Sequence, residues 1–457
     1  MPPLKIRRID CAAGDAAAQL AVLRAQLGAQ GNVVSARGRE LTQRVFGEPL
    51  PPVRVVERVC EEVRKRGADA LFHYTEQFDR VRLNATTLRV TRAEMSLAHA
   101  AANPGFLETV RRVRTNVLSF QSGLLHRDAV MSVAGLHELR VRYRPLRRVG
   151  VMIPGGAAAY PSTLLMTVCP ARAAGVPELA VVMPPTPAGA YNRDLLAVCH
   201  ELGVTEVYRV GGAQAVAALA YGVEGLPAVD MIVGPGNLFV ALAKRHVFGQ
   251  VAIDCIAGPS EVVVMADETA PPAFVAADML AQAEHSPGAS ILVTWHAPLL
   301  DAVASALEGQ LAGLSRADLT RESLEQFGAL VLARDAGEAA EITDQIAPEH
   351  LEIIAAGAED LCAAIANAGA VFLGPYSPVA VGDYAAGPSH VLPTGGAARW
   401  SSGLTANDFL RRSSVLSFTR DGLAKMAPDV LQLAHVEGLT AHAASIDVRF
   451  PRREQSR

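Results

Sequence analysis

The chain has 457 residues, with 42 Lys and Arg against 46 Asp and Glu, so its formal net charge is −4. This length exceeds one ordinary core and predicts two or three domains of about 100–200 residues each. No long run of like charge is present, which argues against a nucleic-acid partner. Half of the residues are hydrophobic and only 5% are aromatic. This composition is typical of helices packed on parallel strands and favours an α/β enzyme.

The six cysteines are scattered without a Cys-x-x-Cys pair, which argues against a disulfide framework, an iron–sulfur cluster or a zinc knuckle. We therefore expect a reducing, cytoplasmic setting. No apolar run follows the basic residues at the start of the chain, so we expect no secretory signal. The longest uncharged stretch, residues 149–171, is interrupted by prolines and glycines. We interpret it as buried strand and loop, and expect no membrane partner.

The first 147 residues contain helical patterns and one clear strand. Residues 1–48 alternate short helical patterns with polar breaks and predict a helical arm. Residues 53–78 have apolar side chains at helical spacing and predict one long amphipathic helix. The strict alternation of residues 139–144 predicts a half-exposed strand whose arginines face solvent.

From residue 148, short apolar strands alternate with helices, as in parallel sheets with crossover helices. The strands form two clusters, 148–233 and 261–373, which predict two doubly wound halves joined near residues 256–260, with a ligand cleft between them. The segment after about residue 404 has too little apolar surface to stand alone and should dock on the body or on a second subunit. The predicted strands are Arg148–Ile153, Leu179–Met183, Glu206–Val210, Met231–Val233, Glu261–Met265, Ser290–Thr294, Ala329–Leu332 and Ala370–Leu373.

Glycine-rich turns follow three strands, at residues 153–156, 210–214 and 233–237. Each would let the backbone approach a phosphate at the start of a helix, although a tight strand-to-helix turn needs glycine in any case. None matches the Gly-x-Gly-x-x-Gly fingerprint, but three such turns in one half favour a nucleotide. Gln214 and Asn237 follow the glycines, where a ribose or a pyrophosphate would lie.

Two segments carry candidate metal ligands. Gln282 and His285 share one face at the end of a helix that begins near Pro272. They are either metal ligands or ordinary polar residues at the protein surface. Asp383 lies in residues 375–390, which predict a long loop after the carboxyl end of a strand, where functional residues gather. It is a candidate oxygen ligand or an ordinary turn residue.

Two further carboxylate and imidazole pairs are candidates for chemistry. Glu349 and His350 follow a proline, and adjacent side chains should point apart and serve two proton transfers rather than pair. The alternative is an exposed Glu at a helix start. Glu437 and His442 interrupt the last helical region, whereas His435 lies two turns away and is interpreted as structural.

Together these residues resemble the histidinol dehydrogenase family. The resemblance runs from about residue 53 to residue 445, and the set as a whole is far more specific than any one motif. It includes the three glycine-rich turns. The other matching segments are Ala257-Gly258-Pro259-Ser260-Glu261, Gln282-Ala283-Glu284-His285, Pro348-Glu349-His350, Gly382-Asp383-Tyr384 with His390, and Glu437-Gly438-Leu439-Thr440-Ala441-His442.

The resemblance implies a zinc-dependent enzyme that oxidises L-histidinol through L-histidinal to L-histidine with two NAD, the last steps of histidine biosynthesis. His350 would remove the hydroxyl proton, and Glu349 would activate water. One Zn²⁺ per subunit would be bound by Gln282, His285, Asp383 and His442. The substrate would be bound by these four ligands together with Ser260, His350, His390 and Glu437. The NAD-binding residues would be Met152, Gln214 and Asn237.

The resemblance also implies a homodimer whose active sites are shared, because His442 and Glu437 would come from the other subunit. The expected fold is two Rossmann-like, doubly wound domains with small N- and C-terminal helical arms in an exchanged dimer. The predicted division is an N-terminal arm (1–48), a discontinuous catalytic and zinc domain (49–147 plus 259–404), an NAD-binding domain (148–258) and a dimerisation segment (405–457).

One departure from the family pattern affects the cofactor. Family members usually have Tyr before the Ile-Pro-Gly-Gly turn, where this chain has Met152. A thioether packs against a flat ring but donates no hydrogen bond, so we expect weaker NAD binding rather than lost activity.

Three alternatives remain at this stage. A dehydrogenase of the same fold could act on another small diol, such as a sulfonated propanediol, but the retention of His390 and Glu437 favours the amino-alcohol. A zinc hydrolase would use Glu349 to activate water without a nucleotide, and the three glycine-rich turns argue against it. A non-catalytic zinc protein would not need the intact pair Glu349 and His350.

Overall fold

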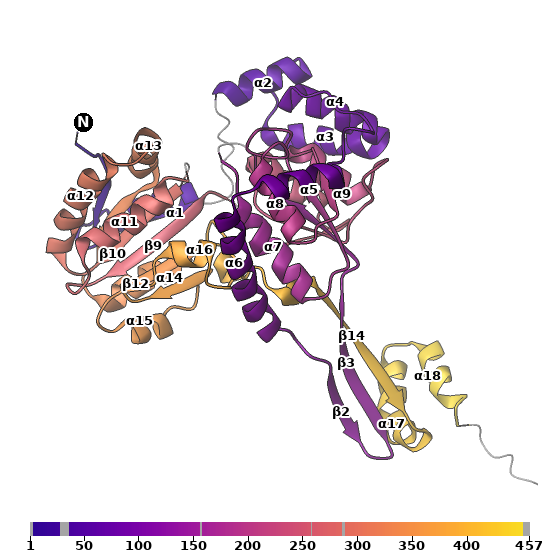
Figure 1. The fold of residues 1–457 in the computed structure, drawn as a ribbon. Helices are drawn as coiled ribbons and strands as arrows, with labels where there is room; N and C mark the ends of the chain where they lie inside the picture. The colour runs from indigo at the N-terminus through magenta and orange to yellow at the C-terminus, as the bar shows by residue number, and fades with distance from the viewer. Residues whose placement is uncertain (1–2, 28–35, 156–157, 257, 286–287, 451–457) are drawn as a thin grey trace, which may run out of the picture. The chain divides into compact units, whose positions relative to one another are not determined.

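The computed structural model describes residues 3–27, 36–155, 158–256, 258–285 and 288–450. The chain forms two compact units (Figure 1). The first unit comprises residues 1–125 and 146–409, and the second comprises residues 126–145 and 410–457. None of the described helices is both long and apolar enough to cross a membrane.

The first unit contains a six-stranded sheet in which every neighbouring pair is parallel. Alternate residues of its central strand face opposite sides: Val262 and Val264 belong to one core cluster, Val263 and Met265 to another. Helices therefore pack on both faces of this sheet, which buries its middle strands. The strands, in spatial order, are β1 (Arg7–Asp10), β11 (Ala329–Leu332), β10 (Gly288–Thr294), β9 (Ser260–Ala266), β12 (His350–Ile354) and β13 (Ala370–Leu373). The helices of this half are α1 (Ala16–Leu27), α11 (Pro272–Ala283), α12 (Ala297–Leu311), α13 (Ala317–Phe327), α14 (Ala336–Ile346), α15 (Ala358–Ala364) and α16 (Val379–Tyr384).

The first unit also contains a five-stranded parallel sheet. From its central strand the chain adds two strands on one side and then two on the other, and such a reversal opens a crevice at the carboxyl ends of the central pair. The strands, in spatial order, are β6 (Glu206–Tyr208), β5 (Glu178–Val182), β4 (Arg148–Met152), β7 (Met231–Val233) and β8 (Ala252–Ile253). The helices of this half are α2 (Ala36–Phe46), α3 (Pro52–Arg66), α4 (Ala68–Asp79), α5 (Arg92–Ala101), α6 (Pro104–Gly123), α7 (Pro161–Ala173), α8 (Arg193–Glu201), α9 (Gly212–Tyr221) and α10 (Leu238–Val247).

The second unit is a three-stranded antiparallel sheet with two helices. The strands, in spatial order, are β14 (Leu410–Phe418), β3 (His137–Pro145) and β2 (Ala129–Val133), and the helices are α17 (Arg420–Val436) and α18 (Thr440–Asp447). Two short 3-10 helices, Ala397–Arg399 and Ala406–Phe409, belong to the first unit.

The predicted α/β class with parallel sheets is confirmed, and each predicted strand after residue 148 corresponds to an observed one. The half-exposed strand is also confirmed, because β3 contains residues 139–144 and exposes Arg140, Arg142 and Arg144.

Three local predictions are wrong. The single helix over 53–78 is two helices, because Gly67 adopts a φ of 57° and separates α3 from α4. The N-terminal arm is not only helical, because Arg7–Asp10 forms the edge strand β1, which pairs with β11. The loop over 375–390 contains the short helix α16.

Candidate active site

The amino ends of β9 and β12 carry the first group of polar residues. Ser260 opens β9 and His350 opens the adjacent strand β12, with Glu349 directly before it. Glu349 is 6% exposed and His350 is 2% exposed, so the alternative of an exposed Glu at a helix start is excluded. These residues lie at the amino edge of the larger sheet, whereas we expected function at carboxyl ends of strands.

Glu349 is held by two donors from β9. The Ser260 hydroxyl and the Glu261 backbone N–H both donate to Glu349 Oε2, the second over 3.0 Å. Burial raises the pKa of Glu349, while the neighbouring His350 and the two hydrogen bonds oppose that rise. A buried carboxyl group in these surroundings is suited to take a proton from water near neutral pH.

His350 is oriented through one ring nitrogen and leaves the other without a partner. Its Nδ1 lies 3.2 Å from the backbone oxygen of Glu261, which fits an Nδ1–H that donates to this carbonyl. Its buried Nε2 has no hydrogen-bond partner within the described part of the chain and lies 3.6 Å from Asp383 Oδ1. In this tautomer Nε2 is the nitrogen that accepts a proton.

The electrostatic environment of His350 is set by two carboxylates. Its Nδ1 lies 3.7 Å from Glu349 Oε2, so the expectation that these neighbours do not pair is wrong in geometry. Glu349 lies just before the first residue of β12, where the alternation of side chains along a strand does not yet apply. Burial would lower the pKa of His350, but Glu349 and Asp383 raise it to about 9. A neutral His350 therefore requires that one of these charges be compensated.

Asp383, on α16, is surrounded by three imidazoles. His390 Nδ1 lies 2.9 Å from the backbone oxygen of Asp383, and His350 lies opposite the carboxylate. Burial opposes ionisation of Asp383, but interactions with His350, His390 and His285 lower its pKa overall. Burial lowers the pKa of His285 and of His390, so both favour the neutral form, which is the form that ligates metals.

Gln282 lies in the last turn of α11, which contacts α16. Its side chain is 2% exposed, and neither its amide oxygen nor its amide nitrogen has a hydrogen-bond partner among the residues that the structure describes. A buried amide without partners costs about 1–3 kcal/mol unless a ligand satisfies it. Within the described ranges, no three His, Cys, Asp or Glu side chains gather as a metal site. A metal site built on His285 and Asp383 would therefore need Gln282 and one further ligand from outside this half.

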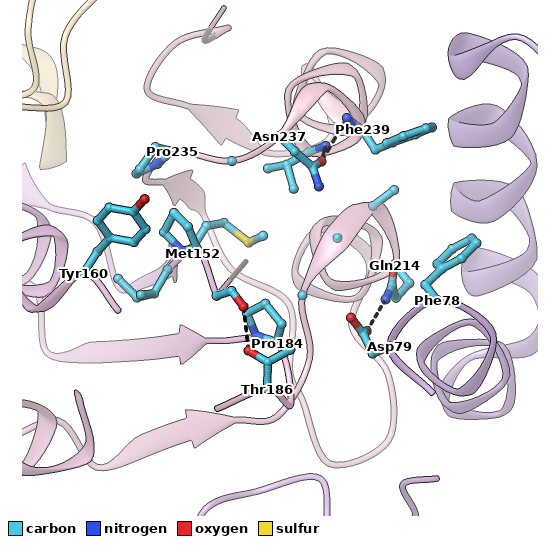
Figure 2. A pocket seen from close by; sticks show the side chains of 18 of the residues that line it. Phe78, Asp79, Met152, Tyr160, Pro184, Thr186, Gln214, Pro235, Asn237 and Phe239 are labelled. Atoms are coloured by element: carbon cyan, nitrogen blue, oxygen red, sulfur yellow. Dashed lines mark hydrogen bonds between the residues drawn. The ribbon is translucent and has the colours of Figure 1, made fainter. Parts of the chain in front are cut away.

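A cavity of about 440 Å³ lies at the carboxyl ends of the smaller sheet, where the strand order reverses (Figure 2). Its walls include parts of all three glycine-rich turns, namely residues 153–155, 211–214 and 235–237. Gly156 lies outside the described residues. Gly212 and Gly234 have φ values of 67° and 105°, which other residues rarely adopt. A Cβ on Gly234 would lie 2.2 Å from the backbone oxygen of Met152, so this turn requires glycine for its own conformation.

The three predicted cofactor residues all line this cavity. Met152 is 3% exposed at the end of β4. Asn237 caps α10, because its Oδ1 accepts hydrogen bonds from the N–H groups of Phe239 and Val240. Gln214 is 1% exposed in the first turn of α9, a helix that no described side chain caps. The N-terminal N–H groups of α9 are thus available to a phosphate.

The remaining predicted residues lie in the second unit. Glu437 is the residue that follows α17, and His442 lies in α18, where its backbone N–H donates to Leu439 O. Both side chains are exposed, as is His435. The predicted interruption of the last helical region is confirmed, because Gly438 adopts a φ of 69° between the two helices.

Several cavity residues were not predicted. Phe78 and Asp79 come from the end of α4, Tyr160 precedes α7, and Thr186 and Phe239 lie beside glycine-rich turns. The sequence could have indicated Asp79, because a carboxylate at the C-terminal end of a helix interacts unfavourably with the helix dipole and therefore calls for another explanation. The aromatic residues carried no such signal.

Comparisons with known proteins identify the family of this chain. The family model for histidinol dehydrogenase matches residues 52–450. The histidinol dehydrogenase of Rhodopirellula baltica is 57% identical over 452 residues, which are 98% of each chain. That of Geobacillus kaustophilus is 47% identical over 402 residues, 88% of this chain and 94% of the relative. The crystal structure of histidinol dehydrogenase from Elizabethkingia anophelis matches with a TM-score of 0.87 at 30% identity, covering 98% of this chain and 99% of that one. The chain therefore belongs to the histidinol dehydrogenase family of enzymes.

Proposed function

We propose that the enzyme oxidises L-histidinol to L-histidine through L-histidinal, the last steps of histidine biosynthesis, with NAD and Zn²⁺. The observation that carries this proposal is the unpartnered Nε2 of His350, buried beside Asp383 in the half of the first unit that also holds the unsatisfied amide of Gln282. A base at this position, next to candidate metal ligands, is suited to an alcohol held by a metal ion.

The donor set fits zinc. Gln282, His285 and Asp383 offer oxygen and nitrogen ligands without a thiolate, and the partnerless amide of Gln282 gives an independent reason to expect a ligand there. The fourth ligand would be His442 of a second subunit. When bound, zinc would compensate the charge of Asp383 and hold the imidazole and amine of the substrate.

The smaller sheet fits NAD. The cavity offers the uncapped N-terminus of α9 for a pyrophosphate, and Phe78 and Phe239 for a flat base. When bound there, NAD would supply the hydride acceptor for both oxidations. Tyr160 directly precedes α7, and the Ser389 hydroxyl donates a hydrogen bond over 2.8 Å to the backbone oxygen of Met166 in that helix. The Tyr160 side of the cavity is therefore connected to the segment that contains His390. The nicotinamide end would lie on that side.

His350 and Glu349 would each carry out different proton transfers. His350 Nε2 takes the hydroxyl proton in the first oxidation. Glu349, held by Ser260 and Glu261, removes a proton from the water that hydrates the aldehyde. His350 takes a proton again in the second oxidation. Ser260 and His390 would contact the substrate, and Glu437 of the second subunit would bind the cationic amine.

We also propose the exchanged homodimer, the Rossmann-like character of the two sheets, the NAD-binding domain (148–258) and the dimerisation segment (405–457). Helices α3 and α4 share a core cluster with the smaller sheet, so we group them with the NAD-binding half rather than with the zinc domain to which residues 49–147 were assigned. The second unit supports exchange because it exposes several large apolar side chains. These are Val130, Met131, Val133, Leu416, Leu433, Val436 and Val448. The strand order of the smaller sheet supports a dinucleotide-binding half.

Turnover of purified, zinc-loaded enzyme tests the substrate assignment. We expect NADH to form when L-histidinol is added together with NAD. Formation of NADH with a sulfonated propanediol and none with histidinol would show that the substrate is a diol of this kind and not histidinol. Hydrolytic activity without any NAD reduction would show that the protein is a hydrolase and not a dehydrogenase.

A further inference from the structure

Asp79 is an acid in an unfavourable position. It is the last residue of α4, which has no basic residue in its last turn, and the next residue, Arg80, ends the helix in the left-handed conformation with φ 59°. A carboxylate at this end of a helix faces the negative end of the dipole. Burial adds a second penalty and raises the pKa of Asp79 to about 6. Helix stability therefore does not explain an acid at this position.

Asp79 faces the cavity together with Gln214 of α9 (Figure 2). Gln214 Nε2 donates to Asp79 Oδ2 over 3.4 Å. The amide of Gln214 is thereby oriented, and its Oε1 is buried with no donor among the described residues. The pair thus presents acceptor oxygens to the cavity, one of which has no partner in the protein.

The charge of the cavity walls restricts the ligand. None of the described residues that line the cavity is Lys, Arg or His, and Asp79 is their one acid. The N–H groups at the start of α9 are suited to a pyrophosphate, but none of the described lining residues carries a positive charge that would neutralise a further phosphate beside Asp79. Neighbouring acceptor oxygens instead suit the two hydroxyl groups of a ribose.

The position of the pair assigns it to one end of the dinucleotide. Figure 2 shows Asp79, Gln214 and Phe78 on one side of the cavity and Met152 and Tyr160 on the other. Tyr160 leads into α7, which is hydrogen-bonded to Ser389 beside His390, so the nicotinamide belongs on the Tyr160 side and the Asp79 side is left for the adenosine.

We propose that Asp79, oriented by Gln214, is the residue that selects NAD over NADP, by accepting a hydrogen bond from the adenosine ribose and repelling a 2′-phosphate. This inference rests on the proposed use of a nicotinamide dinucleotide. In dinucleotide-binding folds a carboxylate after the second strand of the sheet has this task. Here the carboxylate would come from a helix outside the sheet, so its position follows only from the three-dimensional structure.

The decisive variant is Asp79→Asn, which keeps the shape and the contact with Gln214 and removes the charge. We expect kcat/KM with NADP to rise by about ten- to a hundredfold, because the repulsion is lost, while kcat/KM with NAD falls by less than about tenfold. Asp79→Glu keeps the charge and should keep the preference for NAD. Asp69→Asn removes an exposed acid from the same helix and should leave the ratio unchanged.

Calorimetric titration with ADP and with its 2′-phosphorylated analogue tests the same residue without turnover. The unmodified enzyme should bind ADP and reject the analogue, and Asp79→Asn should bind both. If the enzyme binds the two equally, or if Asp79→Asn leaves their ratio within about twofold of its original value, the inference is wrong. Failure of the enzyme to reduce NAD with histidinol would instead reject the proposed function. The titration measures binding without turnover, so the two failures are distinguishable.

Discussion

Lys244 and Asp254 form a buried ion pair behind the third glycine-rich turn, with side chains only 2% and 3% exposed. Lys244 Nζ donates to Gly234 O over 3.1 Å, and Gly234 N–H donates to Asp254 Oδ2 over 2.7 Å. The pair thus holds both backbone groups of Gly234, which directly precedes the cavity residues Pro235, Gly236 and Asn237. Asp254 directly follows β8, the last strand of the smaller sheet before the chain enters the larger one at β9.

Lys244→Met should therefore destabilise the protein strongly. Removing one partner leaves a buried charge without compensation, and we expect the free energy of unfolding to fall by about 3–5 kcal/mol. Denaturant-induced unfolding measures this loss. Lys65→Met is the matched control, because Lys65 and Glu61 form a pair that is 68% and 62% exposed. It should cost less than about 1 kcal/mol, and equal losses in the two variants would contradict the prediction.

His350→Asn should lower turnover by about two to four orders of magnitude, because the proton acceptor is lost. The zinc content should stay unchanged, since His350 is not one of the proposed ligands. Single-turnover kinetics and metal analysis on the same preparation measure both quantities. Near-normal turnover would refute the assignment of the base.

A shared active site predicts complementation between inactive variants. Glu349→Gln and His442→Ala homodimers should each be inactive, but random exchange of subunits gives half heterodimers with one intact site, or about a quarter of full activity. Glu349→Gln mixed with His350→Asn is the control, since both residues would come from the same subunit and no intact site can form. Exchange proven by mass spectrometry without any recovery would count against sharing.

Met152→Tyr should strengthen NAD binding. A phenol at this position of the cavity adds a hydrogen bond worth about 0.5–1.5 kcal/mol, so the KM for NAD should fall about two- to tenfold. Met152→Phe adds the ring without the hydroxyl and separates stacking from hydrogen bonding. An unchanged KM for NAD in Met152→Tyr would show that the thioether of Met152 does not weaken NAD binding.

Glu352 gives the protein a predictable dependence on pH. It lies two residues after His350 in β12 and is 1% exposed, and burial and the neighbouring Asp278 raise its pKa from 4.5 to about 9. The folded state therefore binds this proton more tightly than the unfolded chain, so the stability contributed by the protonated group is lost as pH rises from about 4.5 to about 9.

Glu352→Gln should remove this loss. Relative to the unmodified protein, the variant should unfold at a higher temperature near pH 9 and show no such gain near pH 5. Scanning calorimetry across this range measures the difference, with the exposed Glu359→Gln as control. A difference in unfolding temperature that does not change with pH would contradict the assignment.

The repeating part of the fold was predictable because buried parallel strands are short apolar runs. Eight of the strands between Arg148 and Leu373 were located in this way. β1 was missed because its sequence, Arg-Arg-Ile-Asp, is polar and lies at a sheet edge. β12 was missed because its first and third residues, His350 and Glu352, are polar and interrupt the apolar pattern.

The candidate site was predictable in its residue types and less so in its geometry. The motifs containing Gln282, Glu349, His350 and Asp383 are visible in the sequence. That Ser260 and Glu261 orient the acid and the base depends on the register between β9 and β12, which no local pattern encodes. Asp79 illustrates the same limit, since it reaches the cavity only because α4 packs beside α9.

The yield of NADH for each molecule of histidinol consumed tests the proposed reaction most directly. With zinc-loaded enzyme and excess NAD, the four-electron oxidation requires two NADH and one L-histidine for every L-histidinol. Removal of zinc by a chelator should abolish both products, and its return should restore them. A single NADH with accumulation of free histidinal, or no NADH from fully zinc-loaded enzyme, would contradict the proposed function.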